Sequence, residues 1–127
     1  MKNLFIIAAL MITLAANSQS RIGHKAKDIF YEFESQGIEY MGSEDEMYLL
    51  YHFNENLIIE YLFDKDSICD RVLVQTFTQE MTDFIVNTYE ARGYIKIHDG
   101  WLARNNGIIY KIAHKVQDDN TNLFLWY

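Results

Sequence analysis

The side chains that could carry chemistry in this chain are few, and their spacing matches no catalytic or metal-binding motif. The histidines are His24, His52, His98 and His114. None has the HExxH or Hx₃H spacing with which a helix presents two histidines to one zinc ion. His52, His98 and His114 fall on or beside expected strands, so a zinc site built from them would depend on the tertiary structure.

Two acidic turns could bind a cation. The turn from Asp64 to Asp70 has carboxylates at alternate positions, as calcium loops do, but it lacks their central glycine and closing glutamate. The second turn is Asp118-Asp119-Asn120. Asp and Asn are favoured in turns because their side chains accept hydrogen bonds from nearby backbone N–H groups. We therefore predict no metal ligand and no cofactor.

Nucleophilic catalysis needs a nucleophile held beside a base. Cys69 is the only cysteine, and any base would have to come from a distant histidine. The serine-hydrolase motif GxSxG is missing, the glycines are isolated, and no spacing among the acids selects a glycosidase pair. We assign no catalytic residue and predict a non-enzymatic protein. The alternative is a small exported hydrolase or metal-binding protein with a site of strand histidines and acids.

Residues 1–20 have the pattern of a secretory signal peptide. Lys2 is followed by the apolar run Leu4 to Ala16 and then by small and polar residues. The alternative is a membrane anchor, but the run is shorter than the ~20 residues that span a bilayer. No later stretch is apolar for long enough to span. We expect export to the periplasm, the cell envelope or the extracellular space.

The remaining residues, 21–127, suit one domain. Removing Lys2 leaves 10 basic and 18 acidic residues, a net charge of −8. Such a chain should be repelled by nucleic acid and by anionic lipid. A single cysteine allows no internal disulfide, so the stability of an exported domain must come from its apolar core.

Hydrophobic periodicity predicts two helices and eight strands. The helices are expected at 21–36 and 79–92, each with one apolar stripe and each ended by a glycine, Gly37 or Gly93. Alternating runs separated by turn residues predict strands at 38–41, 47–53, 57–63, 68–77, 94–98, 101–105, 108–116 and 122–127. The connections are too short for helical crossovers, so neighbouring strands should be antiparallel.

This element order predicts an α+β domain in which two tandem αββββ units, 21–77 and 78–127, form one antiparallel sheet with both helices on one face. The halves align at an offset of 56 in the helices, where Phe33 and Gly37 match Tyr89 and Gly93. The offset is 50 in the strands, where a few apolar residues match: Ile58, Ile59 and Leu73 with Ile108, Ile109 and Leu123. We interpret the pattern as a possible internal duplication.

In element order alone, the arrangement resembles that of β-lactamase-inhibitor-like and PepSY-like proteins, with no motif residues to carry the likeness. The resemblance implies a binding or inhibitory module that grips a protein with an open sheet face.

Two helices cannot cover both faces of eight strands, yet many strands have apolar residues on both sides. The sheet could curl over its second face, another chain could dock there, or the face could bind a ligand. We predict a protein partner or self-association through aromatic residues of the sheet. The candidate contacts are Tyr48, Tyr51, Tyr61, Trp101, Tyr110 and Trp126.

Overall fold

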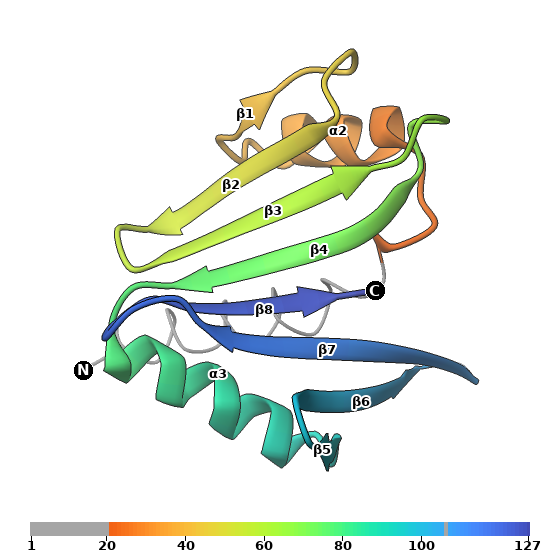
Figure 1. Cartoon of the computed structure of the whole chain (residues 1–127). Helices are drawn as coiled ribbons and strands as arrows, with labels where there is room; N and C mark the ends of the chain where they lie inside the picture. Colours follow the sequence, from red (N-terminus) through yellow and green to blue (C-terminus); the bar gives the residue numbers. More distant parts are fainter. Residues whose placement is uncertain (1–20, 106) are drawn as a thin grey trace.

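The computed structural model describes residues 21–105 and 107–127 as an α+β fold with two helices and an eight-stranded antiparallel sheet (Figure 1). The helices are α2 (Ala26–Ser35) and α3 (Gln79–Ala91). The strands are β1 (Met41–Gly42), β2 (Tyr48–Asn54), β3 (Leu57–Phe63), β4 (Cys69–Thr76), β5 (Ile95–Ile97), β6 (Gly100–Asn105), β7 (Ile108–Val116) and β8 (Asn122–Trp126). None of the described helices is long and apolar enough to cross a membrane.

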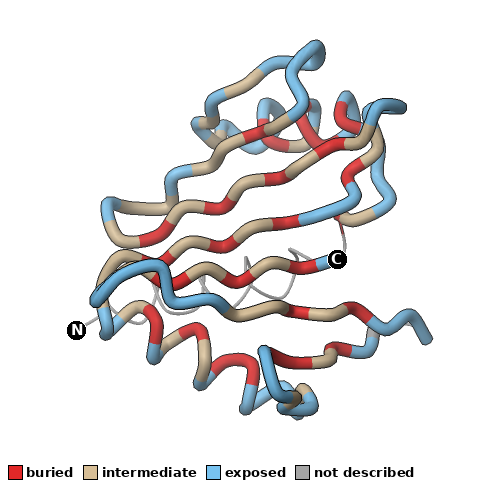
Figure 2. Tube along the Cα trace, viewed as in Figure 1, coloured by how far each residue is buried: buried red, intermediate tan, exposed pale blue. Residues whose placement is uncertain are grey.

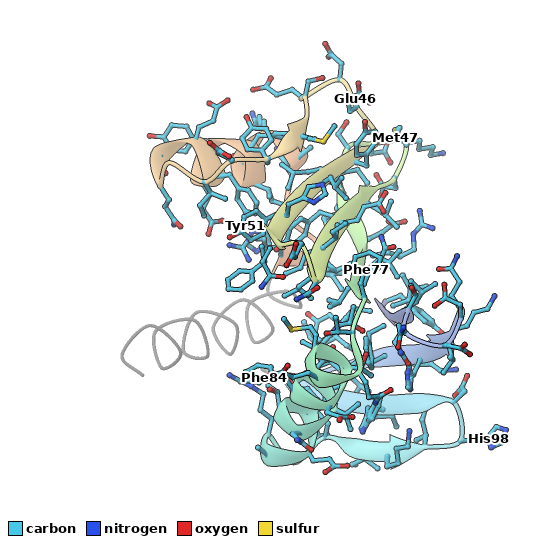
Figure 3. All side chains as sticks on the ribbon, turned by 90° about the vertical axis from the view of Figure 1, so that its left-hand side faces the viewer. Glu46, Met47, Tyr51, Phe77, Phe84 and His98 are labelled. Atoms are coloured by element: carbon cyan, nitrogen blue, oxygen red, sulfur yellow. The ribbon has the colours of Figure 1, made fainter. Side chains whose placement is uncertain are left out.

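The strand order in the sheet is β1-β2-β3-β4-β8-β7-β6-β5, so the sheet has two halves that meet where β4 pairs with β8. Each half is a meander in which consecutive strands pair. Both helices lie on the same face of the sheet, α2 over the first half and α3 over the second (Figure 3). This part of the arrangement agrees with the prediction from the hydrophobic pattern.

The core lies between this face and the helices. One row of side chains crosses it in register from β2 to β6, and every member is buried: Leu49, Tyr61, Val72, Trp126, Ile112 and Trp101. Phe33 of α2 packs edge-on against Tyr61, with ring centroids 5.7 Å apart. Tyr89 of α3 packs against Trp126 in the same manner at 5.6 Å.

The two helices end in the same way. Gly37 and Gly93 both have positive φ, 68° and 76°, a conformation that costs a glycine little because it has no Cβ. The next N–H group turns back to a carbonyl of the last helical turn, from Ile38 to Phe33 and from Tyr94 to Tyr89. This is the Schellman pattern of helix termination. A glycine in the sequence therefore marks the end of each helix.

The start of the first helix differs from the prediction. α2 begins at Ala26, and Arg21 to Lys25 form a turn that leads into a β-bridge between Lys25 and Ile68, at the β3–β4 connection. Gly23 donates its N–H to the Cys69 carbonyl at 2.6 Å, and Arg21 pairs with Glu32 at 2.8 Å. Tertiary hydrogen bonds thus replace one turn of helix, because local periodicity does not record partners that are distant in sequence.

A test of the core concerns the hydrogen bond that the Trp126 indole donates to the Tyr89 hydroxyl at 3.1 Å. Both side chains are buried. We expect Tyr89→Phe to leave a buried N–H without a partner and to lower the free energy of unfolding by about 1–3 kcal/mol. Urea denaturation followed by tryptophan fluorescence measures this. The control Tyr31→Phe, at an exposed position of α2, should change it by less than about 0.5 kcal/mol; an equal effect of both variants would contradict the assignment.

Candidate functional site

The face of the sheet away from the helices carries the candidate site, and we call it the open face. Side chains alternate between the two faces of a strand, so the neighbours of the buried core residues point to this side. The open face is formed by Tyr48, Leu50 and His52 of β2, Ile58, Glu60 and Leu62 of β3, Arg71, Leu73 and Gln75 of β4, Leu123 and Leu125 of β8, Ile109, Lys111, Ala113 and Lys115 of β7, and Gly100, Leu102 and Arg104 of β6.

Aliphatic side chains dominate the centre of the open face. They are Leu50, Ile58, Leu62, Leu73, Leu102, Leu123 and Leu125, and all are half-buried. Figure 2 shows the result as an alternation of buried and intermediate residues along each central strand. Leu73 and Leu125 are directly opposite each other where the two halves meet. An apolar surface therefore runs across the sheet without interruption at the junction.

The charges on the open face differ between the halves. Glu60 of β3 lies in the first half, and Lys111 and Lys115 of β7 lie in the second. The Lys111 ammonium binds the Asp99 carboxylate at 3.1 Å. This hydrogen bond lowers the pKa of Asp99 and raises the pKa of Lys111, because it stabilises both charged forms. The first half also carries Arg71 opposite Leu62, so it presents an acid and a base, whereas the second half presents bases.

Most of the predicted aromatic contacts are not on this face. Tyr61, Trp101, Tyr110 and Trp126 are buried on the helix side, so their expected exposure to a partner is wrong. Tyr51 also points to the helix side, where its ring packs edge-on against Phe33 with centroids 5.8 Å apart.

Tyr48 alone of the predicted contacts lies on the open face, where it is half-buried opposite Leu62. The other candidates lie on the helix side because each helix covers half of a wide sheet. Large rings fill the space between helix and sheet that short aliphatic side chains would leave empty. The sequence feature that marks the open face is the second apolar set in the strands, the leucines and isoleucines that alternate with the aromatic residues.

The histidines occupy separate places. His52 is exposed on the open face, and His98 is exposed in the β5–β6 turn. His114 faces the helix side, where its ring stacks on Phe124 at 4.5 Å and its Nε2 is 2.8 Å from Oδ1 of Asn122. Within residues 21–105 and 107–127, no group of three His, Cys, Asp or Glu side chains could hold a metal ion. Within the described residues, the histidines and acids of the alternative site are therefore not brought together.

The carboxylates of the acidic turns accept hydrogen bonds from backbone N–H groups of the same turns. Asp64 accepts hydrogen bonds from the N–H groups of Asp66 and Ile68, at 2.8 and 3.0 Å. Asp118 accepts from Asn120 and Thr121, at 3.0 and 2.8 Å. These bonds lower the pKa of Asp118 because they stabilise its charged form. Both carboxylates therefore hold the conformations of turns, the role that turn propensity alone gives them.

Cys69 has the properties of a core residue. Its side chain is fully buried, and its Sγ lies 3.5 Å from the Arg71 carbonyl. Burial raises the pKa of the thiol to about 12, because the thiolate would lose its hydration. The thiolate is the nucleophilic form, so this environment suppresses the reactivity of Cys69.

This burial predicts a measurable difference in thiol labelling. At pH 8 we expect an aromatic disulfide reagent to modify Cys69 at least ~100-fold more slowly in the folded protein than in urea-unfolded protein. Release of the coloured thiolate measures the rate. A control variant, Gln117→Cys, places a thiol in the exposed β7–β8 turn and should react at the unfolded rate. Rapid labelling of Cys69 in the folded protein would contradict its placement in the core.

No protein-family model, curated protein or solved structure shows significant similarity to this chain.

Proposed function

We propose that this protein is an exported, non-enzymatic binding module that takes up a protein partner on the open face of its sheet. The observation that carries the proposal is the aliphatic surface across β2, β3, β4 and β8, with Glu60 and Gln75 spaced within it, on the side that neither helix covers. Contiguous apolar surface of this kind on a folded protein is typical of contact sites. Its aliphatic centre bordered by charged side chains resembles the core and rim of an interface.

The chemistry of the face supports protein binding over catalysis. Covering a half-buried leucine with a partner contributes about 25 cal/mol per Å² of apolar area removed from water. The polar groups on the face, among them Glu60, Arg71, Gln75 and Lys115, are spaced among aliphatic residues and do not converge on one point. Such a surface suits a broad contact better than the enclosed pocket that a small substrate needs.

We further propose that the chain arose by internal duplication of an αββββ unit, with units at 21–77 and 78–127. The β4·β8 ladder supports this. Its central pair is Val74 with Phe124, and an offset of 50 residues maps one member onto the other. The flanking pairs, Val72 with Trp126 and Thr76 with Asn122, are exchanged by the same offset. The matching ends of α2 and α3 support the offset of 56 in the helices.

The alignment of β3 with β7 needs a correction under this proposal. Ile59 lies beside Val74, and His114 lies beside Phe124. A two-fold relation through the β4·β8 ladder therefore matches Ile59 with His114, and the predicted match of Ile59 with Ile109 is five residues out of register. The likeness to β-lactamase-inhibitor-like and PepSY-like proteins stays a prediction from element order.

Export is the remaining part of the proposal. It rests on the signal-peptide pattern of residues 1–20, which lie outside the described residues. Whether the destination is the periplasm, the envelope or the extracellular space is decided by fractionation of the producing cells.

The binding face is tested with Leu73→Glu and Leu125→Glu, which place a charge at the centre of the open face. We expect each variant to capture its partner from an envelope extract at least ~10-fold less well than the unchanged protein, because a desolvated carboxylate opposes apolar contact. Capture on immobilised protein, quantified by mass spectrometry, measures this. The control Tyr31→Glu introduces the same charge on the exposed side of α2 and should leave capture unchanged. Equal capture by all these folded proteins would sink the proposal.

A further inference from the structure

Two methionine side chains of the described chain are largely open to solvent. Met41 is 57% exposed and Met47 is 54% exposed. We propose that both are sites of reversible oxidation by peroxides, and that oxidation of Met41 weakens the binding of a partner to the open face. The effect on binding rests on the proposed function of that face.

The chemistry needs only an accessible sulfur atom and a peroxide. The thioether sulfur attacks one oxygen of hydrogen peroxide or of an alkyl hydroperoxide, and the O–O bond breaks. The sulfur gives up two electrons to form the sulfoxide. The proton on the attacked oxygen passes to the leaving oxygen, which departs as water or as an alcohol. Methionine sulfoxide reductases reverse the change, so the modification can act as a switch.

The other sulfur atoms of the described residues are better shielded. Met81 is half-buried on α3, where it packs against the core. Cys69 is fully buried. A thioether has no proton to lose before it reacts, so access of the oxidant decides which methionine reacts first. We therefore expect Met41 and Met47 to be oxidised before Met81, and Cys69 to stay reduced in the folded protein.

Met41 extends the apolar surface of the open face to the edge of the sheet. It belongs to the edge strand β1 and lies directly opposite Leu50. The next residue, Gly42, is on the helix side, because a Cβ there would lie 3.6 Å from Cζ of the Phe30 ring. Side chains alternate along a strand, so Met41 points to the open face, as Leu50 does.

The backbone of β1 holds Met41 close to Leu50. Gly42 has a φ of 120°, and a Cβ there would lie 2.7 Å from the Tyr48 carbonyl oxygen. Only glycine fits this conformation and this close approach, so the pairing of β1 with β2 is fixed at this point. Directly opposite residues have Cβ atoms about 5 Å apart. A partner that covers Leu50 therefore also contacts Met41.

Met47 is similarly exposed but lies on the other side. Its carbonyl accepts the N–H of Phe63 at 3.2 Å, so it continues β2 opposite a residue that is buried on the helix side. Oxidation turns a flexible apolar side chain into a polar one. The sulfoxide oxygen of Met41 would have to lose its hydration when a partner binds, whereas that of Met47 would stay in water.

The oxidation order is tested on the folded, exported protein with hydrogen peroxide, followed by peptide mapping and mass spectrometry. Cleavage after glutamate separates the two sites, because Glu44 and Glu46 lie between them. We expect Met41 and Met47 to be oxidised at least about fivefold faster than Met81, and all three rates to converge in urea. Oxidation of Met81 as fast as theirs in the folded protein would overturn the assignment of the two sites.

The effect on binding is tested by capture from the envelope extract after the peroxide has been removed. The readout is the set of proteins that the unchanged protein captures and Leu73→Glu does not. We expect oxidation to lower this capture about fivefold, and a methionine sulfoxide reductase to restore it. Met41→Leu keeps an apolar side chain of similar size and should keep its capture after oxidation, whereas Met47→Leu should lose capture as the unchanged protein does.

A second pair of variants repeats the comparison without oxidant. Met41→Gln places a polar side chain of similar length at the open face and should lower capture about fivefold, whereas Met47→Gln should leave it unchanged. Circular dichroism of each variant, and of each protein after oxidation, shows that it is folded before it is compared.

The outcomes separate this inference from the proposed function. Capture that oxidation leaves unchanged, or that oxidation lowers equally in Met41→Leu, overturns the regulation by Met41. A protein that captures nothing removes the binding proposal and the regulation together. The oxidation order is decided by the peptide map alone, whatever the capture experiment gives.

Discussion

The pairing of β4 with β8 is the constraint on which the rest of this structure depends. It joins two four-stranded meanders into one sheet and fixes which side chains face which way. Val72 and Val74 meet Trp126 and Phe124 on the helix side, while Leu73 meets Leu125 on the other. A slip of one residue would move both aromatic rings out of the core, because side chains alternate with period two. Burial of these side chains on the helix side therefore fixes the register of β4 and β8. The same register decides which residues lie on the open face.

The division of apolar side chains between the faces has a consequence for association. Aromatic rings fill the space between the helices and the sheet. The Tyr89 ring, for example, contacts four others: Tyr94, Trp101, Phe124 and Trp126. Shorter leucines and isoleucines cover the open face. An aliphatic surface of this kind gains little from a small ligand but gains steadily with contact area, which favours the proposed contact with a protein.

The residues that suggest chemistry in the sequence do structural work instead. Cys69 is a buried neutral thiol, His114 stacks on Phe124 and bonds to Asn122, and Asp64 and Asp118 hold turns through backbone N–H groups. Each side chain satisfies a local need for hydrogen bonding or burial. The reactive groups are thus separated by the sheet and are not gathered at one site within the described chain.

The sequence by itself determined the elements, because they depend on local physics. Periodicity located both helices and seven of the strands. The strand predicted at 38–41 is wrong, because β1 is only Met41–Gly42. Gly37 and Gly93 marked the helix ends by their freedom at positive φ, and the acidic turns followed from Asx hydrogen bonding. What only the tertiary structure decided was the side of the sheet that each alternating set occupies. Strands such as Leu57–Phe63 are apolar on both faces, so alternation alone is symmetric between them. The positions of the helices break that symmetry, through contacts such as Phe33 with Tyr61, and these contacts join residues too distant in the chain for periodicity to register.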